Sequence, residues 1–565
     1  MDSGPFGWAV TLSTGCRSHS NPASAADAIY YGGDIVTIND AQPTVEALAI
    51  KDGKILMAGS REEIEKNHKG ESTVMVDLAG KTLTSSFIDP HSHFSDSLSM
   101  ADRVNVSAPP VGPASNPAEI VAELQRYAKS KEAGELIVGY GYDENLMPRG
   151  QHLTRDQLDK ALPNNPVLIV HVSMHGAVLN SAAFEKFGYK DGMKTPEGGI
   201  ITRKPGIQAL DGLVMETAYL PVVSNMPNPT PDQVIENGRT GQMIYAKAGV
   251  TTAREGATHE SQLEVLQELA AKHVLFIDVV SYPFILDLDK VLAKYPPSTF
   301  GIYKDRLKLG GCKITLDGSP QGKTALFNTP YLTGGPTGQK NWRGGPTFPQ
   351  DFANASVRKC YDNGLQMLIH ANGDGAVDMA LKAHEFAAAG SLDKDRRTVI
   401  IHSQFARKYQ LQKYVQYKLI PSFFTEHTFL FADAHLKNRG KEQAYFMSPM
   451  KTAIDFGLRP TNHTDYGVAP IGQMATIWTA VNRISRSGEI IGPDQRVSPL
   501  EALKAITINA AYQYGEENLK GSLEPGKLAD LVILDKNPLK VDAMAIKNIR
   551  VVETIKEGKT IYKAN

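Results

Sequence analysis

Histidines that directly follow apolar runs are the residues of this sequence best suited to chemistry. His91 and His93 are separated by one residue and come shortly after the apolar Phe87–Ile88. Because residues i and i+2 of a strand project to the same face, both imidazoles could bind one metal ion. The same pattern also fits two exposed imidazoles after a proline turn, so spacing alone leaves both interpretations open.

Two more histidines, His370 and His402, each end an apolar run, and they stand 32 positions apart. That interval is about one β/α unit, which places the two side chains on neighbouring strands at the same end of a parallel sheet. A lone histidine in such a position is more often a core or rim residue. Two at this spacing favour a shared metal site.

A carboxylate and a lysine occupy comparable positions. Asp465 follows the apolar segment 458–463, and a carboxylate beside a divalent metal can both bind the metal and accept a proton from its water. The alternative for Asp465 is a turn or helix-capping role. Lys313 stands in the apolar segment 309–316, where an unpaired ammonium is costly. From the residues alone, a lysine that reaches solvent or pairs with Asp317 is preferred.

The elements that must position these residues alternate in type along the middle of the chain, as in β/α units. The predicted strands there are 250–254, 307–316, 365–370, 398–402, 419–425 and 458–463. The predicted helices are 117–130, 231–248, 260–272, 352–363, 376–389 and 499–511. Residues 106–230, rich in glycine and proline, are interpreted as an insertion that could roof the site.

Both ends of the chain instead consist of short β-branched runs, at 28–39, 47–58 and 74–83 and again at 529–534, 549–555 and 560–562. Asp52-Gly53 and Glu557-Gly558 stand between such runs, as hairpin turns do. These features predict a small composite β-sandwich built from residues 28–83 and 513–565. Residues 1–27 are a leader, either disordered or a degenerate export signal that ends near Cys16.

Composition restricts the partners. Lys and Arg number 60 against 61 Asp and Glu, so nothing indicates a nucleic-acid or charged-membrane partner. No run approaches the roughly 18 apolar residues that a transmembrane span needs. Cys16, Cys312 and Cys360 fit neither a zinc cluster nor a disulfide framework. A metal would therefore be held by His, carboxylate or a modified Lys. Localisation stays open between the cytoplasm and a bacterial periplasmic or lipoprotein-like location.

Several longer motifs together resemble the amidohydrolase superfamily, in the branch called amidohydrolase family 3 or YtcJ-like. The resemblance covers the chain from about residue 28 to 561. Its motifs are SSFIDPHSHF at 85–94, VSMHGAVLNS at 172–181, KITLDGSPQGKTA at 313–325, IHANGDGAVD at 369–378 and GSLEPGKLADLVILDKNP at 521–538. The resemblance implies an α/β fold, a distorted (β/α)₈ TIM barrel at 84–512 with the composite β-sandwich domain beside it.

The resemblance also implies a binuclear metal centre, with Zn²⁺ as the preferred ion. His91, His93 and Asp465 would bind one metal, and His370 and His402 the other. Lys313, carboxylated on its side-chain nitrogen, would bridge the two together with a hydroxide. A mononuclear site with unmodified Lys313 remains open.

Substrate contacts are expected from residues around this centre. His175, in the second motif, is a candidate for hydrogen bonding to the substrate or oxyanion, with a structural role as the alternative. His427 and His463 follow apolar runs and are predicted to line the pocket. Tyr142 and Trp342 are further candidates, although large aromatic side chains more often belong to the core.

The predicted function is hydrolysis of a C–N bond in a small amide-like substrate, an N-acyl or N-formyl amine or a carbamate. A metal lowers the pKa of bound water from about 15.7 towards about 7. The resulting hydroxide would attack the carbonyl carbon, with Asp465 as general base and then acid. The alternatives are a cyclic amidase, an esterase or a deaminase on the same scaffold, and a non-catalytic metal-binding or regulatory protein. A homo-oligomer is left open.

Overall fold

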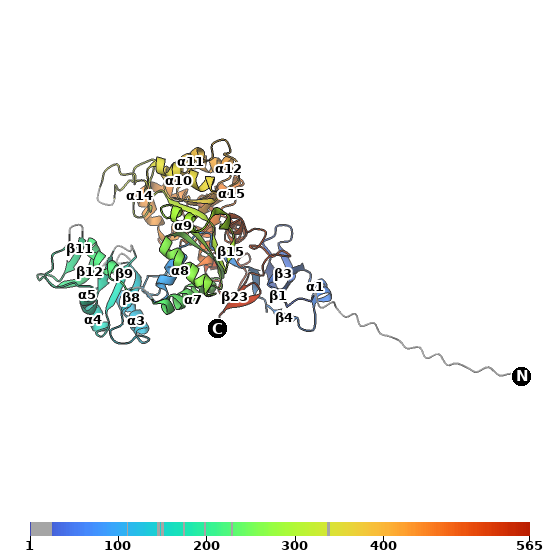
Figure 1. The fold of residues 1–565 in the computed structure, drawn as a ribbon, viewed down its shortest axis with the longest axis horizontal. Helices are drawn as coiled ribbons and strands as arrows, with labels where there is room; N and C mark the ends of the chain where they lie inside the picture. Colours follow the sequence, from blue (N-terminus) through green and yellow to red (C-terminus); the bar gives the residue numbers. More distant parts are fainter. Residues whose placement is uncertain are drawn as a thin grey trace.

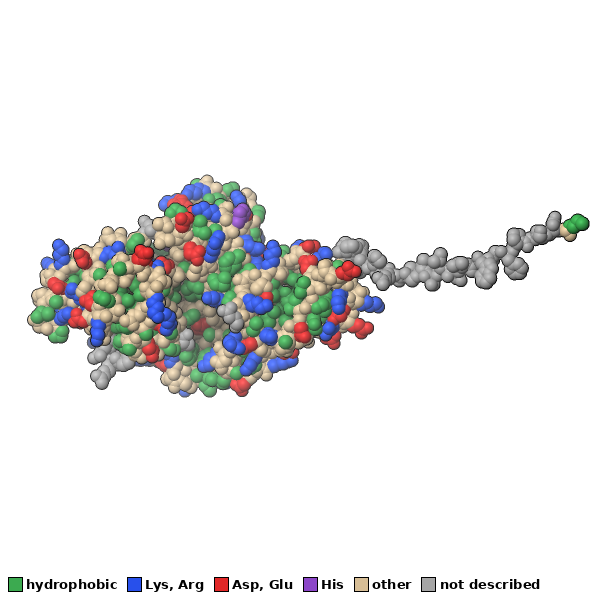
Figure 2. Space-filling model, turned by 90° about the horizontal axis from the view of Figure 1, so that it is seen from below, with side chains coloured by type: hydrophobic (Ala, Val, Ile, Leu, Met, Phe, Trp, Pro, Cys, Tyr) green, Lys and Arg blue, Asp and Glu red, His purple; other side chains and the backbone are tan. Residues whose placement is uncertain are grey.

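The computed structural model describes residues 1, 25–109, 111–143, 147, 152–172, 176–196, 199–227, 230–335 and 339–564. Cys16, most of the predicted leader and the catalytic candidate His175 lie outside these ranges. Within them, no helix combines the length and the apolar character that a membrane span requires. On the face drawn in Figure 2, side chains of both charges are intermixed over the surface, in line with the balanced composition.

Strands from the two ends of the chain pair in one eight-stranded sheet, on the right of Figure 1. Its members are β1 (Ala28–Val36), β2 (Thr44–Lys51), β3 (Lys54–Gly59), β4 (Val74–Asp77), β5 (Thr82–Ser85), β22 (Leu531–Leu534), β23 (Val551–Lys556) and β24 (Lys559–Lys563). Antiparallel pairing of β5 with β22 joins the two ends. Both predicted hairpin turns are confirmed, with positive φ at Asp52-Gly53 and at Glu557-Gly558.

Two five-stranded sheets form the middle of the molecule. The first contains β6 (Phe87–Ile88), β13 (Val250–Thr258), β14 (Asp278–Pro283), β15 (Tyr303–Lys304) and β16 (Leu307–Leu309). The second contains β17 (Gly311–Thr315), β18 (Gln366–Ala371), β19 (Val399–His402), β20 (Ile420–Phe423) and β21 (Thr461–Asn462), all parallel to their neighbours.

The two sheets meet along both borders. On one side the Ile285 amide donates to the Lys313 carbonyl at 2.8 Å. On the other, the Asp465 amide donates to the His91 carbonyl at 3.1 Å, beyond the ends of β21 and β6. The chain segments that carry the predicted ligands are therefore brought together by backbone hydrogen bonds. Full closure into a (β/α)₈ barrel stays a prediction.

Helices follow the strands, as the alternating pattern predicted. Those nearest the central sheets are α2 (Phe94–Met100), α7 (Pro231–Lys247), α8 (Glu260–Ala271), α9 (Leu288–Lys294), α10 (Gln350–Asp362), α11 (Asp374–Ala387), α12 (Lys408–Tyr417), α13 (His427–Leu430), α14 (Ala432–Tyr445), α15 (Met450–Asp455), α16 (Gln473–Asn482), α17 (Pro499–Ala505) and α18 (Ile508–Gln513). The single helix predicted at 499–511 was wrong, because the backbone leaves helical geometry at Thr507. The strand predicted at 307–316 likewise breaks at Gly310, where a Cβ would lie 2.4 Å from the Tyr282 ring.

The predicted insertion folds around its own hydrophobic clusters and forms the lobe on the left of Figure 1. Its six-stranded sheet contains β7 (Val104–Asn105), β8 (Ile137–Tyr142), β9 (Val167–His171), β10 (Gly176–Leu179), β11 (Gly199–Arg203) and β12 (Leu210–Glu216). The accompanying helices are α3 (Pro117–Ala128), α4 (Arg155–Ala161), α5 (Ser181–Lys186) and α6 (Leu220–Ser224).

The interpretation of the cysteines was wrong in one respect. Cys312 of β17 and Cys360 of α10 form a disulfide, with their Cα atoms 6.3 Å apart and both side chains buried. Cys360 follows Cys312 by 48 positions, and the segment between them contains the connection that returns α10 against the sheet. Cysteine spacing could not reveal this pair, because the helix-on-strand packing that brings them together is a tertiary contact.

Candidate metal centre

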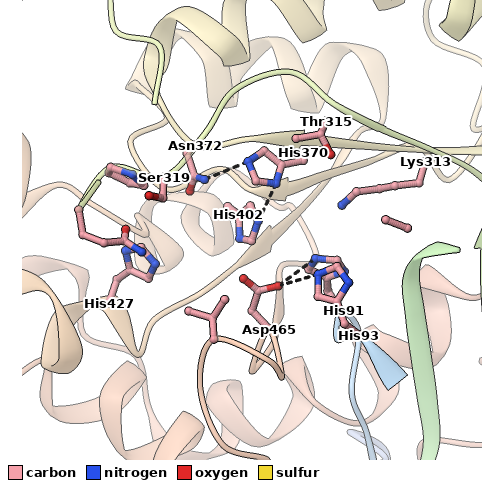
Figure 3. Close-up of a pocket in the computed structure, with 14 residues that line it drawn as sticks. His91, His93, Lys313, Thr315, Ser319, His370, Asn372, His402, His427 and Asp465 are labelled. Carbon is pink, nitrogen blue, oxygen red and sulfur yellow. Dashed lines mark hydrogen bonds and ion pairs between the residues drawn. The ribbon is translucent and has the colours of Figure 1, made fainter. Parts of the chain in front are cut away.

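All the predicted metal ligands line one cavity of about 230 Å³ at the carboxyl ends of the central strands. Figure 3 shows them directed into the same space. They are His91 and His93 after β6, Lys313 in β17, His370 in β18, His402 at the end of β19, and Asp465 after β21. Segments hundreds of residues apart in the sequence thus supply one site.

The first group consists of His91, His93 and Asp465. Nε2 of His91 lies 3.1 Å from Asp465 Oδ1, and Nε2 of His93 lies 3.6 Å from the same oxygen. One ligand atom from each of the three falls within 4.8 Å of the others, close enough to hold one ion. β6 ends at Ile88, so the two histidines stand in the following turn rather than in the strand. Their side chains nevertheless converge as the pair spacing predicted.

A second group of possible ligands shares His402 with the predicted one. His402, His463 and Asp465 offer ligand atoms within 4.8 Å of one another, whereas His370 is outside that set. His370 remains adjacent, with its Nδ1 3.1 Å from His402 Nε2. His463, predicted as a substrate contact, is instead buried behind the cavity with Nε2 3.1 Å from His402 Nδ1. It is absent from the described residues that line the cavity.

Two of these residues have left-handed backbone conformations that non-glycine residues rarely adopt: φ is 69° at His402 and 53° at Asp465. Such conformations persist where surrounding contacts enforce them, and they cluster at functional sites. At Asp465 the amide bond to the His91 carbonyl is one such contact.

The surroundings of the site favour neutral His91 and His402 and an ionised Asp465. At His93, burial lowers the pKa, but Asp465 and Glu255 outweigh it and raise that pKa. Burial, followed by the nearby Lys313, holds the pKa of His91 well below its usual value. Burial and His370 do the same for His402. Burial alone would raise the pKa of Asp465, but His402 and the histidine pair beside it hold that pKa well below its usual value. Neutral imidazole and ionised carboxylate are the forms that bind metal.

Lys313 does not form the pair with Asp317 that the residues alone favoured. Its side chain is 1% exposed, and Nζ has no hydrogen-bond partner in the described structure. Burial, with repulsion from Arg254 as the next cause, holds its pKa well below the usual lysine value. Asp317 instead accepts hydrogen bonds from the Leu326, Asn372 and Gly373 amides at 2.9 Å.

Three supporting residues escaped the sequence analysis. Asp89 is buried and bonds to the Thr464 hydroxyl at 2.5 Å, tying the ends of β6 and β21 together. Arg254 is buried beneath the site and donates to the Pro90 carbonyl. A Cβ at Gly256 would lie 2.6 Å from Nδ1 of His91, so only glycine leaves room for that ring. Asp89 could have been singled out from its place beside the histidine pair, whereas Arg254 and Gly256 carried no local signal.

The predicted substrate contacts have different outcomes. His427 lines the cavity (Figure 3). Tyr142 is buried in the core of the insertion, and Trp342 donates from Nε1 to the Lys323 carbonyl at 2.6 Å; neither is among the cavity-lining residues described. The wall also includes Ser319, Gln321 and Asn372, which the sequence analysis did not propose. None of the described lining residues comes from the insertion, so its role as a roof stays a prediction.

The donor set fits a divalent metal. Imidazole nitrogens and a carboxylate oxygen converge from several strands, without a described Lys or Arg paired to Asp465. Nitrogen and carboxylate ligands in this number suit Zn²⁺ and related ions. Lys313 adds a buried amine that lacks a hydrogen-bond partner at the same cavity.

Sequence comparisons agree with this chemistry. The model of the amidohydrolase family matches residues 74–562. The chain is 29% identical to Protein LONG AFTER FAR-RED 3 of Arabidopsis thaliana, over 97% of this chain and 93% of the relative. It is 24% identical to N-substituted formamide deformylase of Arthrobacter pascens, over 95% and 98%. It is 23% identical to the putative amidohydrolase YtcJ of Bacillus subtilis, over 95% and 99%.

Solved structures similar to this chain are also hydrolases. An uncharacterized metal-dependent hydrolase from Pyrococcus horikoshii superimposes with a TM-score of 0.71 at 25% identity, covering 91% of this chain and 99% of that one. A mutant form of the atrazine chlorohydrolase TrzN of Arthrobacter aurescens, complexed with zinc, aligns with a TM-score of 0.51 at 12% identity, covering 95% of each chain. This second likeness concerns the fold alone.

Proposed function

The chain belongs to the amidohydrolase family, and from this premise we propose that it hydrolyses the C–N bond of a small amide-like substrate. The substrate class is an N-acyl or N-formyl amine, or a carbamate. The observation that carries the proposal is the convergence of His91, His93, Lys313, His370, His402 and Asp465 on one cavity. A relative that covers nearly the whole chain is an N-substituted formamide deformylase, which supports a formyl or other small acyl group.

The proposed cofactor is zinc, in a binuclear centre. His91, His93 and Asp465 would hold one ion, and His402 and His370 the second, with His463 beside His402 as a further candidate. Lys313, as its N-carboxylate, would bridge them. Its buried amine without a hydrogen-bond partner supports this assignment, because a carbamate forms from a neutral amine and carbon dioxide. When bound, zinc supplies a Lewis acid for the carbonyl oxygen and lowers the pKa of water.

The chain's own residues provide proton transfer and exclusion of solvent. Asp465 is ionised and reaches the cavity, so its free carboxylate oxygen can accept a proton from the attacking water and return it to the departing nitrogen. Its left-handed backbone and the bond from its amide to the His91 carbonyl hold that carboxylate in place. The buried aromatic ring of Phe424, next to His463 and His427, keeps that side of the site apolar.

Cavity size restricts the substrate. A volume of about 230 Å³ is below the roughly 300–1,000 Å³ of pockets that enclose drug-sized ligands. The cavity therefore suits a small acyl group, with the amine portion directed towards the opening. This supports formyl and acetyl substrates over large acyl chains.

The proposal extends to the architecture. The two central sheets form a distorted (β/α)₈ barrel within residues 84–512, with the insertion at 106–230. Residues 28–83 and 513–565 form the composite β-sandwich domain, and residues 1–27 are a leader. Backbone bonds at both borders between the central sheets support the barrel, and the pairing of β5 with β22 supports the composite domain.

The test combines metal analysis with turnover. We expect elemental analysis to find close to two zinc ions per chain, and the zinc-loaded protein to hydrolyse members of a panel of formamides, N-acyl anilides, carbamates, lactams and esters. Hydrolysis of the formamides should be fastest. Stoichiometric metal without turnover of any panel member would contradict the proposal and favour a metal-binding or regulatory protein.

A further inference from the structure

His427 and a histidine outside the predicted site, His435, form a buried pair at the cavity wall. Nδ1 of His427 lies 3.0 Å from Nε2 of His435, and the two ring planes are within 12° of parallel. Both side chains are buried, but only His427 lines the cavity. In the view of Figure 3, His427 stands at the end of the cavity away from Lys313.

The surroundings of His435 determine which nitrogen donates. Its Nδ1 is buried and has no hydrogen-bond partner in the described structure, and its ring packs edge-on against Phe405. A buried N–H without a partner is rarer than a buried acceptor without one. Nδ1 of His435 is therefore the unprotonated nitrogen, and the proton of this neutral ring is on Nε2. His435 donates to His427.

The tautomer of His427 follows from that of His435. Since its Nδ1 accepts the bond from His435, the proton of the neutral ring must sit on Nε2. His427 Nε2 has no hydrogen-bond partner among the described residues. It is also not among the unpartnered side-chain atoms that are fully shielded from solvent. The remaining sides of the ring pack against Phe424 and Phe431, with ring centroids 4.7 and 4.9 Å away. The N–H is left facing the cavity.

We propose that His427 is a substrate-binding residue that presents a neutral N–H donor to an acceptor oxygen of the substrate outside the scissile group, and that His435 is the positioning residue that fixes this tautomer. The preferred substrates are N-acyl amines that carry an ether, carbonyl or carboxylate oxygen at the matching distance. This specificity rests on the proposed function, whereas the tautomer rests on the histidine pair alone.

The tautomer is tested first, by ¹⁵N NMR of histidine-labelled protein, with the His427 signals assigned by comparison with His427→Asn. We expect a protonated Nε2 and an unprotonated Nδ1 in His427. His435→Gln keeps a donor towards His427 and should preserve this pattern. His435→Leu removes the donor and should leave the proton of His427 distributed over both ring nitrogens. A His427 proton on Nδ1 in the unmodified protein would overturn the proposal, and this measurement needs neither turnover nor a stable His435 variant.

Selectivity is tested with formyl amines in which one methylene, moved stepwise along the chain, is replaced by an ether oxygen. One ether should exceed its methylene analogue in kcat/KM by about tenfold, mainly through KM. The advantage should persist in His435→Gln, vanish in His427→Phe and decrease in His435→Leu. His384→Gln is the matched control, because His384 is buried against Tyr361 away from the cavity and should leave the ratio unchanged.

An ether advantage that survives His427→Phe would overturn the substrate contact. Absence of any ether advantage in the unmodified enzyme would overturn it as well. Absence of all turnover would instead contradict the proposed function, and the NMR result would still decide the tautomer.

Discussion

Two buried lysines, Lys313 at the cavity and Lys556 near the opposite ends of the central strands, have contrasting surroundings. Nζ of Lys313 has no hydrogen-bond partner in the described part of the chain. Nζ of Lys556 lies 2.8 Å from a carboxylate oxygen of Asp278 and 2.8 Å from one of Asp530. Burial lowers the pKa of Lys313; for Lys556 burial acts in the same direction, but Asp530 and Asp278 outweigh it and raise the pKa.

The two lysines therefore distinguish charged groups that stabilise the fold from groups available for chemistry. Lys556 belongs to a network in which Lys520 also bonds to Asp278, at 2.6 Å, so that β14 is tied to the terminal sheet. Every buried cation there has a carboxylate partner, as the cost of burying charge requires. At the cavity, ligand atoms converge and a buried amine lacks a hydrogen-bond partner. Groups with shifted pKa values in a cavity indicate chemistry rather than support of the fold.

Among the substitutions that test this contrast, Asp465→Asn should have the largest effect, a loss of catalytic activity. The amide cannot carry the proton, so kcat should fall by about 10²–10⁴-fold. The variant should still fold, but with a lower midpoint of thermal unfolding, because the histidines that hold the pKa of Asp465 down lose their ionised partner. Kinetics with a formamide substrate and calorimetry of the metal-free proteins provide the measurements. Near-normal turnover would contradict the role of Asp465.

At the opposite ends of the strands, substitution should reduce stability rather than activity. Lys556→Met leaves Asp530 buried without its cation, so the free energy of unfolding should fall by about 3–5 kcal/mol. Zinc content of the folded fraction should be unchanged. Urea denaturation with elemental analysis tests both statements. A Lys556→Met protein as stable as the unmodified one would show that the network is not structural.

A buried acid near the cavity gives a smaller, pH-dependent effect. Glu426 accepts a bond from the Thr476 hydroxyl at 2.7 Å, and burial raises its pKa to about 8 from 4.5. The folded state therefore binds this proton more tightly than the unfolded state. The resulting stability is complete below about pH 4.5 and is lost as the pH rises towards 8.

Between these limits the free energy of unfolding should fall, relative to Glu426→Gln, by on the order of 1 kcal/mol per pH unit. Urea unfolding of both proteins across this range measures the difference. Parallel curves for the two proteins would contradict the raised pKa.

The smallest change in stability is expected where the lysine lacks a hydrogen-bond partner. Lys313→Met removes a buried amine without breaking a described bond, so the metal-free protein should be as stable as the unmodified one, or slightly more stable. Lys313→Ala should lose metal and regain part of its activity with added short carboxylates. Unchanged metal content in Lys313→Ala would count against the bridging role.

The sequence was sufficient for features that depend on local pattern. Periodicity and turn chemistry account for the alternation of strands and helices, for the hairpin turns at Asp52-Gly53 and Glu557-Gly558, and for the position of His402 at a strand end. The convergence of the predicted ligands also followed, because parallel strands place their carboxyl ends on one side.

What the sequence did not reveal depends on tertiary contact. The Cys312–Cys360 disulfide requires α10 to pack on β17. The placement of His463 behind His402 depends on the backbone turn after β21, and the partner of His427 comes from a separate helix, α14. Tyr142 was expected at the site, but the insertion buries it in a core of its own.

The central claim, that these side chains form a metal centre, is tested most directly by anomalous diffraction at the zinc absorption edge from crystals of the zinc-loaded protein. We expect one anomalous peak among His91, His93 and Asp465 and a second beside His402, with continuous density joining Lys313 to both. Crystals that contain zinc elsewhere but show no peak in this cavity would contradict it.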